Sequence, residues 1–230
     1  MSALLVCAPL RIEARALRAG LDRWTVLRTG CGPARSARSA ASLPAGGVSA
    51  LVVAGLGGGL APGSRSGDVV VADELLDHAG TLHYGPDCAG KVCCRAESFT
   101  HVHCGHFDGA HVSSLVDQLR REGLRVHRGP IATADHVVLG AERAALARSG
   151  ALAVDMESAE LARAARDRPL AVVRVLLDTP GEPLIGAGLP RRLHRALHVL
   201  RLLGAPLDRW SQAIRGRSTT ASVHTGEDFR

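Results

Sequence analysis

Residues 151–178 read ALAVDMESAELARAARDRPLAVVRVLLD, and this stretch decides the fold. Ala151–Val154 is a short apolar run typical of a strand. Leu170–Leu177 is an almost continuous apolar run, typical of a strand that is covered on both faces. A helix is expected between them, starting near Glu157 and ending before Arg168-Pro169. A strand, a helix and a second strand in this order favour a parallel sheet.

The same alternation of apolar runs and amphipathic stretches extends over most of the chain. It predicts further strands at Ala3–Ala8, Thr25–Arg28, Ala50–Ala54, Asp68–Ala72 and Val126–Thr133, and further helices at Glu13–Leu21, Ala34–Leu43, His111–Glu122 and Pro190–Leu203. The fold class is therefore α/β, with helices on both sides of a mainly parallel sheet. No domain boundary is visible within residues 1–205, and the polar residues 206–230 are predicted to form a flexible tail.

Composition and charge exclude several classes of protein. The net charge of +6 permits attraction to phosphate groups, but aromatics are only 3% and the arginines are scattered, so no nucleic-acid partner is predicted. No apolar run approaches the roughly 18 residues that a membrane span needs. Met1–Leu10 lacks the basic region of a signal peptide and is better explained as a buried first strand, which predicts a cytoplasmic location.

Glycines follow the predicted strand Ala50–Ala54. The run Gly55-Leu56-Gly57-Gly58-Gly59 would let a ligand approach the backbone closely, or it forms a tight structural turn. The spacing is not the G-x-G-x-x-G of dinucleotide-binding folds, so little favours an oxidoreductase.

Two carboxylates appear where the strand Ala151–Val154 ends. Open α/β sheets bind ligands at the carboxyl ends of their strands, and Asp155 and Glu157 lie there. A carboxylate accepts two hydrogen bonds from a vicinal diol such as that of ribose, and Met156 would offer an apolar surface to the sugar. The alternative is that Asp155 and Glu157 only cap the following helix.

Asp178 and Glu13 are candidate catalytic groups. Asp178 ends the strand Leu170–Leu177 and precedes the loop Thr179-Pro180-Gly181. A carboxylic acid there could supply the proton or hydrogen bond that a departing purine needs, whereas the alternative is an aspartate that only forms the turn. Glu13 follows the first strand and either caps the first helix or orders a nucleophile on the sugar side.

Six segments occur together and in order in one family. They are Leu4–Leu17, Thr29–Ala41, Val53–Val71, Gly129–Gly140, Ala151–Ala159 and Ala171–Asp178. On these segments the chain resembles the nucleoside phosphorylase superfamily, which includes purine nucleoside phosphorylases, methylthioadenosine/adenosylhomocysteine nucleosidases, futalosine hydrolases and hopanoid-associated phosphorylases. The run Glu-Ala-Arg at residues 13–15 and the run Val-Asp-Met-Glu-Ser at residues 154–158 resemble the hopanoid-associated branch most.

The resemblance implies roles for individual residues. Glu157 looks like the glutamate that binds the ribose hydroxyls, and Met156 like the methionine against the sugar. Asp178 looks like the aspartate that donates to purine N7, and Glu13 like the glutamate that activates water in the hydrolases. Asp155 stands where many members have glutamate.

The resemblance also places the base site and implies the architecture. Gly57 and Gly58 fall in the family's glycine turn, and Val137 falls on the segment that contacts the base through its backbone. The implied fold is a three-layer αβα sandwich around a mixed, mostly parallel and partly barrelled sheet. The implied enzyme is a homo-oligomer that needs no cofactor and binds no metal.

The expected function is cleavage of the N-glycosidic bond of a purine-type, adenosine-like nucleoside by phosphorolysis or hydrolysis. Inorganic phosphate is therefore a candidate co-substrate, and Arg35, Arg38, Arg65 and Arg174 are available to meet it. Three positions depart from the family: Leu56 and Leu177 replace serines, and Val137 replaces a stacking aromatic. The two leucines motivate the alternative of a nucleoside-binding homologue without turnover.

Residues 77–111 break the strand and helix pattern. They hold four cysteines and six histidines, but their spacing does not follow the usual C-x₂-C of zinc knuckles. We expect a long irregular surface excursion without a metal site.

Overall fold

The computed structural model describes residues 3–21, 24–44, 46–77, 83–84, 107–166 and 168–223. The predicted excursion over residues 77–111 therefore lies largely outside the described residues, as do the four cysteines Cys88, Cys93, Cys94 and Cys104.

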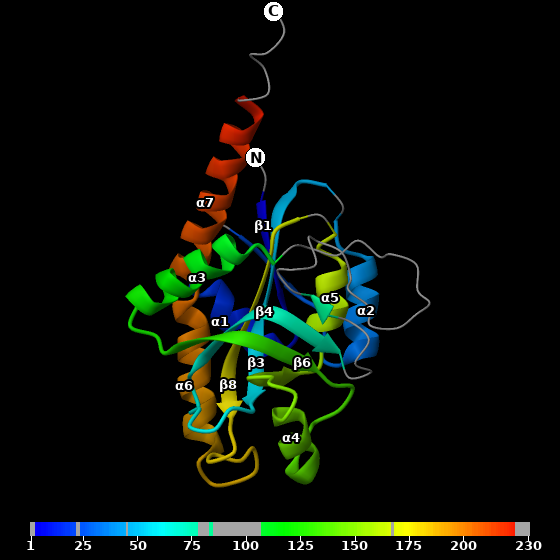
Figure 1. The fold of residues 1–230 in the computed structure, drawn as a ribbon, viewed down its shortest axis with the longest axis vertical. Helices are drawn as coiled ribbons and strands as arrows, with labels where there is room; N and C mark the ends of the chain where they lie inside the picture. The colour runs from blue at the N-terminus through cyan, green and yellow to red at the C-terminus, as the bar shows by residue number, and fades with distance from the viewer. Residues whose placement is uncertain are drawn as a thin grey trace, which may run out of the picture.

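Among the described residues, eight strands form one mixed sheet (Figure 1). They are β1 (Ala3–Ala8), β2 (Thr25–Arg28), β3 (Val48–Gly59), β4 (Val69–Asp77), β5 (His83–Tyr84), β6 (Val126–Thr133), β7 (Ala153–Asp155) and β8 (Leu170–Asp178). The antiparallel pairs are β3 with β7, β4 with β8 and β4 with β5, and the other pairs are parallel. The prediction of a mixed, mostly parallel sheet is confirmed.

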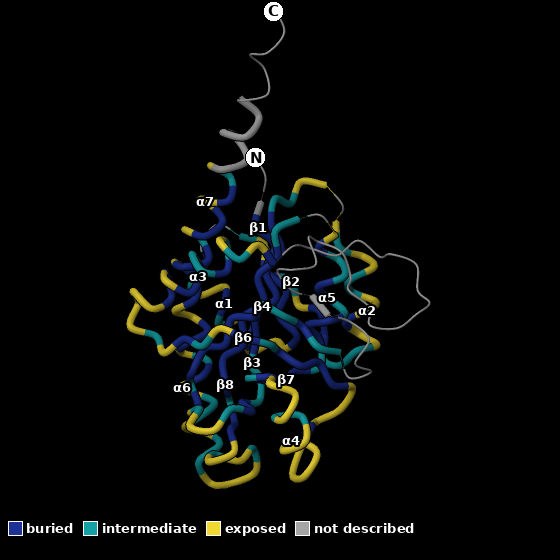
Figure 2. Tube along the Cα trace, in the orientation of Figure 1, coloured by how far each residue is buried: buried dark blue, intermediate teal, exposed yellow. Residues whose placement is uncertain are grey.

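Part of the sheet closes on itself. β8 pairs with both β3 and β4, β4 pairs with β6, β6 pairs with β7, and β7 returns to the end of β3. Along β8, the side chains from Leu170 to Leu176 are all buried, as the continuous apolar run predicted. The buried stretches in Figure 2 follow these central strands, and the exposed stretches lie on the outer helices and loops.

Helices cover the sheet on two sides, which gives the three layers (Figure 1). α2 (Pro33–Ala41) and α5 (Ser158–Arg163) pack together on one side. On the other lie α1 (Arg11–Arg18), α3 (Gly109–Arg121), α6 (Leu189–Leu202) and α7 (Gly204–Val223). The short helix α4 (Gly140–Ala147) stands at one end of the sheet and was not predicted.

Residues 224–230 of the predicted flexible tail lie outside the described residues. The prediction is wrong for residues 206–223, because they belong to helix α7. Its side chains Leu207, Trp210 and Ile214 are buried, and the Trp210 indole donates a hydrogen bond to the His111 carbonyl at 3.0 Å. Apolar residues recur here at spacings of three and four, which is the pattern of a helix that buries one face. The surrounding polar composition masked this pattern.

The glycine run is not a turn, because strand β3 continues through it to Gly59. None of its glycines has a positive φ. A Cβ on Gly59 would lie 2.7 Å from Leu176 Cδ1, and one on Gly57 would lie 3.2 Å from the Val154 carbonyl oxygen. Side chains at these two positions would crowd the neighbouring strands β7 and β8. This close approach explains the glycines, and a turn in the backbone does not.

The carboxyl ends of three strands meet at one edge of the sheet. Gly58 near the end of β3 is in register with Val154 of β7 and with Asp178 of β8. This pairing brings the segments that follow β7 and β8 to the same place, although β7 runs antiparallel to β3 and β8 runs parallel to it.

Candidate active site

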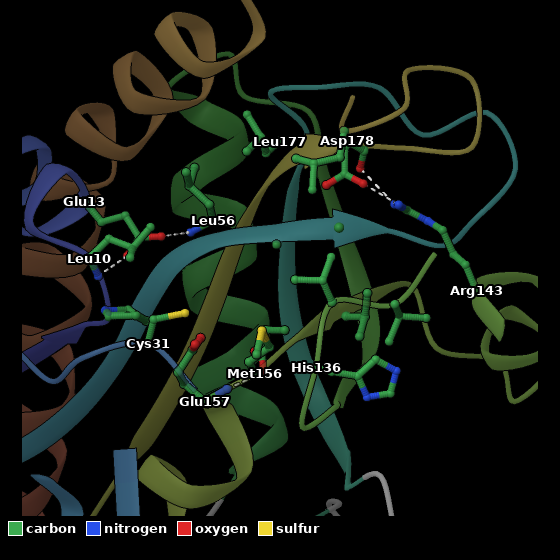
Figure 3. A pocket seen from close by; sticks show the side chains of 18 residues that line it. Leu10, Glu13, Cys31, Leu56, His136, Arg143, Met156, Glu157, Leu177 and Asp178 are labelled. Carbon is green, nitrogen blue, oxygen red and sulfur yellow. Dashed lines mark hydrogen bonds and ion pairs between the residues drawn. The ribbon is translucent and has the colours of Figure 1, made fainter. Parts of the chain in front are cut away.

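A pocket opens at this edge of the sheet (Figure 3). Its volume of about 210 Å³ far exceeds the roughly 30 Å³ that one water occupies, so it accommodates an organic molecule. The lining includes every residue that was predicted to be catalytic or to bind the nucleoside: Glu13, Gly57, Gly58, Val137, Asp155, Met156, Glu157 and Asp178.

Glu13 lies at the floor of the pocket, buried at 2% exposure. One oxygen accepts a hydrogen bond from the Leu10 amide at 2.6 Å, so Glu13 does cap helix α1. The other accepts from the Leu56 amide at 2.8 Å, on the glycine-rich end of β3. Burial raises the pKa of the Glu13 carboxyl above its ordinary value of 4.5, although the Leu56 amide and the Arg174 charge oppose this shift.

Glu157 lies opposite Glu13, at the start of α5. Its Oε1 accepts a hydrogen bond from the Gly32 amide at 2.9 Å, and its Oε2 lies 3.6 Å from the Arg174 guanidinium. Beside it, burial and the Glu157 charge raise the pKa of the Cys31 thiol to about 11, so this thiol is protonated at neutral pH. A buried carboxylate at the pocket wall fits the predicted ribose ligand.

Asp155 uses both carboxylate oxygens within the protein. Oδ1 accepts from the Thr133 hydroxyl at 2.9 Å and from the amides of Glu157 and Ser158 at 3.1 and 3.0 Å. Oδ2 accepts from Arg174 Nε at 2.7 Å. These bonds favour the alternative in which Asp155 caps helix α5. In this role Asp155 fixes the position of the pocket wall.

Arg174 is a charge in the core, with a side chain that is 0% exposed. Besides Asp155 and Glu157 it contacts Ser158, whose hydroxyl lies 3.0 Å from Nη2. The sequence analysis offered Arg174 as a phosphate ligand, but it is enclosed by these partners instead. Of the other arginines proposed for phosphate, Arg35 and Arg38 line a neighbouring hollow and not this pocket.

Asp178 meets a residue that the sequence analysis missed, Arg143 of helix α4. Arg143 Nη1 forms an ion pair with Asp178 Oδ2, and its Nη2 donates to the Gly59 carbonyl at 2.6 Å and the Asp178 carbonyl at 3.1 Å. Both side chains are nearly buried, at 11% and 9% exposure. No helix was predicted around residue 143, so nothing in the sequence pointed this arginine at the site.

Apolar side chains form much of the remaining wall. Leu56 and Leu177, which replace serines of the family, both face the pocket, and Met156 lies beside Glu157 (Figure 3). Val137 is 54% exposed at the mouth. Its neighbour His136 lies 2.5 Å from Asp135 and 2.9 Å from Glu142, and hydrogen bonds to these carboxylates raise its pKa.

The part of the chain that the structure describes contains no group of three or more His, Cys, Asp and Glu side chains placed to hold a metal ion. None of its helices is both long and apolar enough to cross a membrane.

A family model covers most of the chain: that of the phosphorylase superfamily matches residues 14–189. The chain belongs to the phosphorylase superfamily. The match begins one residue after Glu13 and includes Arg143, Glu157 and Asp178. This membership confirms the predicted family and an enzyme of the phosphorylase or nucleosidase type.

Solved structures share the fold of this superfamily member. The 5′-methylthioadenosine/S-adenosylhomocysteine nucleosidase of Helicobacter pylori aligns with a TM-score of 0.71 at 19% identity, covering 91% of this chain and 99% of that one. The futalosine hydrolase of Helicobacter pylori aligns with a TM-score of 0.69 at 17% identity, covering 90% and 97%. The 5′-methylthioadenosine/S-adenosylhomocysteine nucleosidase of Campylobacter jejuni aligns with a TM-score of 0.68 at 15% identity, covering 91% of this chain and 98% of that one. A search of curated protein sequences finds no match.

Proposed function

We propose that this superfamily member cleaves the N-glycosidic bond of a purine-type, adenosine-like nucleoside. The observation that carries the proposal is the convergence of Glu13, Glu157 and Asp178 on one pocket at the carboxyl edge of the sheet. Family membership supports it, and so do the structural neighbours, whose names specify 5′-methylthioadenosine, S-adenosylhomocysteine and futalosine. The proposal includes no cofactor and a homo-oligomeric enzyme.

The sugar is assigned to the side of the pocket formed by Glu157 and Met156. The Glu157 carboxylate keeps acceptor capacity beyond its bond from Gly32, and a ribose diol would donate to it. Met156 contributes an apolar surface to the sugar face. The base is assigned to the side of Asp178 and Val137, which line the same pocket from β8 and from the loop after β6.

Water is the nucleophile that the lining favours over phosphate. Arg143 is the one arginine among the described residues that line the pocket, and it is paired with Asp178 on the side assigned to the base. Leu56 places an apolar side chain where the family carries a serine. Glu13, with its raised pKa, is suited to take a proton from a water that attacks the sugar.

A nucleoside panel assayed with and without phosphate tests the proposal. We expect release of free purine from at least one adenosine-like nucleoside, including 5′-substituted ones, at the same rate in phosphate-free buffer. Strict dependence on phosphate would refute water as the nucleophile but not bond cleavage. Thermal stabilisation by a nucleoside without any base release would favour the alternative of a binding homologue.

Glu13→Gln is expected to lower kcat by about 10²–10⁴-fold, the usual contribution of a general base. Because the base must be deprotonated and burial raises its pKa, wild-type activity should fall as pH decreases through a value above 4.5. A pH profile of kcat measures both effects, with Glu160→Gln on the outer part of α5 as the control. Full activity of Glu13→Gln, or an acidic limb at or below the ordinary carboxyl value, would refute this role.

A further inference from the structure

Arg143 lines the pocket and keeps one hydrogen-bond donor without a partner among the described residues. A guanidinium carries five N–H donors. Four of them are engaged by the Gly59 carbonyl, the Asp178 carbonyl and Asp178 Oδ2. The fifth is on Nη1, the nitrogen that pairs with Asp178, and it has no hydrogen-bond partner among the described residues. A side chain that is 11% exposed and lines the pocket therefore presents one unused donor.

Asp178 presents the complementary group. Its Oδ2 is paired with Arg143, while Oδ1 has no hydrogen-bond partner among the described residues. The pair thus retains one donor and one acceptor on two residues that line the pocket. The N7 and N6 edge of a 6-aminopurine shows the matching pattern, with an acceptor at N7 and a donor at the exocyclic amine.

From this geometry we propose that Arg143 is a catalytic residue that donates a cationic hydrogen bond to N7 of the departing base. The inference rests on the proposed function and deepens it. Asp178 anchors Arg143 through Oδ2 and receives the exocyclic amine on Oδ1. The Arg143 guanidinium then takes the place of a proton on Asp178 as the positive partner of the leaving base.

The reaction balances with this assignment. The bond between C1′ and N9 breaks heterolytically, and its electron pair goes to the base. The oxygen of the attacking water forms the new bond to C1′, and its proton passes to Glu13. The base leaves with its negative charge held by Arg143 and takes up a proton from solvent after release. A charged donor preorganised in a nearly buried site stabilises such developing charge strongly.

Methylation at N7 provides the test, because an N7-methyl nucleoside is already cationic and releases a neutral base. We expect Arg143→Met to lower kcat/KM on the parent purine nucleoside by about 10²–10³-fold, as for loss of one preorganised donor. The N7-methyl counterpart should be affected much less, because it needs no donor at N7 and is repelled by the wild-type cation. Arg143→Lys should restore part of the activity on the parent.

The measured quantity is the ratio of kcat/KM for the N7-methyl nucleoside to that for the parent. It should rise by at least about tenfold in Arg143→Met, the smallest effect consistent with loss of such a donor. It should stay constant in Arg148→Met, which removes an exposed arginine just beyond helix α4. An unchanged ratio in Arg143→Met, with or without loss of activity, would overturn the inference and leave Arg143 a structural role. A wild-type protein that cleaves neither nucleoside would instead refute the proposed function.

Discussion

Asp178→Asn is expected to lower kcat for purine nucleoside cleavage by about 10²–10³-fold, the range for loss of one preorganised donor at the leaving group. The amide removes the negative charge that holds Arg143 at the base, and it removes the carboxyl that faces the leaving group. The fold should survive, because the Asn oxygen can still accept one hydrogen bond from Arg143. Steady-state assays on the best nucleoside substrate measure the change.

The control for Asp178→Asn is Asp73→Asn, which changes an aspartate that pairs with Arg128 away from the pocket. This control should keep near wild-type kcat and thermal stability. If Asp178→Asn kept full turnover on the same substrate, Asp178 would only form the turn that follows β8, and the assignment of the base side of the pocket would be wrong.

Arg174→Met is expected to destabilise the protein by about 3–5 kcal/mol, the usual cost of removing one partner of a buried ion pair. The substitution leaves the Asp155 carboxylate, which is 1% exposed, without its cation. It also removes the positive charge that lies 3.6 Å from the Glu157 carboxylate. Urea unfolding followed by circular dichroism gives the free energy of unfolding.

A second substitution separates charge from packing in this cluster. Adding Asp155→Asn to Arg174→Met should recover part of the lost stability, because the unpaired negative charge is then removed while the amide oxygen can still cap α5. A loss below about 1 kcal/mol for Arg174→Met would mean that Asp155 and Arg174 contribute no more than an exposed pair, and the cluster would not be what holds Glu157 in place.

The α/β fold class and eight of the residues that line the pocket were predicted from the sequence. Apolar runs such as Leu170–Leu177 identify strands buried on both faces, and Glu157 and Asp178 each follow the end of a predicted strand. The rule for parallel strands does not explain why they meet, because β7 runs antiparallel to β3 whereas β8 runs parallel to it. Glu13 was a candidate from its place after the first strand, and the resemblance added its role in activating water. These residues line one pocket in the structure.

Other features depend on contacts between segments far apart in sequence. Arg143 reaches Asp178 from 35 residues away, and no local pattern marks that pairing. The glycines Gly57 and Gly59 suggested a turn. The need for glycine comes instead from the neighbouring strands β7 and β8, which lie close to β3 at these positions. Helix α7 was hidden by its polar composition, because its stability comes from packing of Trp210 and Ile214 and not from local propensity.

Identification of the products of an adenosine-like nucleoside is the most direct test of the central claim. After incubation with wild-type enzyme in phosphate-free buffer, mass spectrometry should find equal amounts of free purine and of the sugar with a hydroxyl at C1′. The matched Asp178→Asn sample should contain almost only the intact nucleoside. Intact nucleoside in the wild-type sample, for every purine nucleoside that raises its melting temperature, would contradict the account.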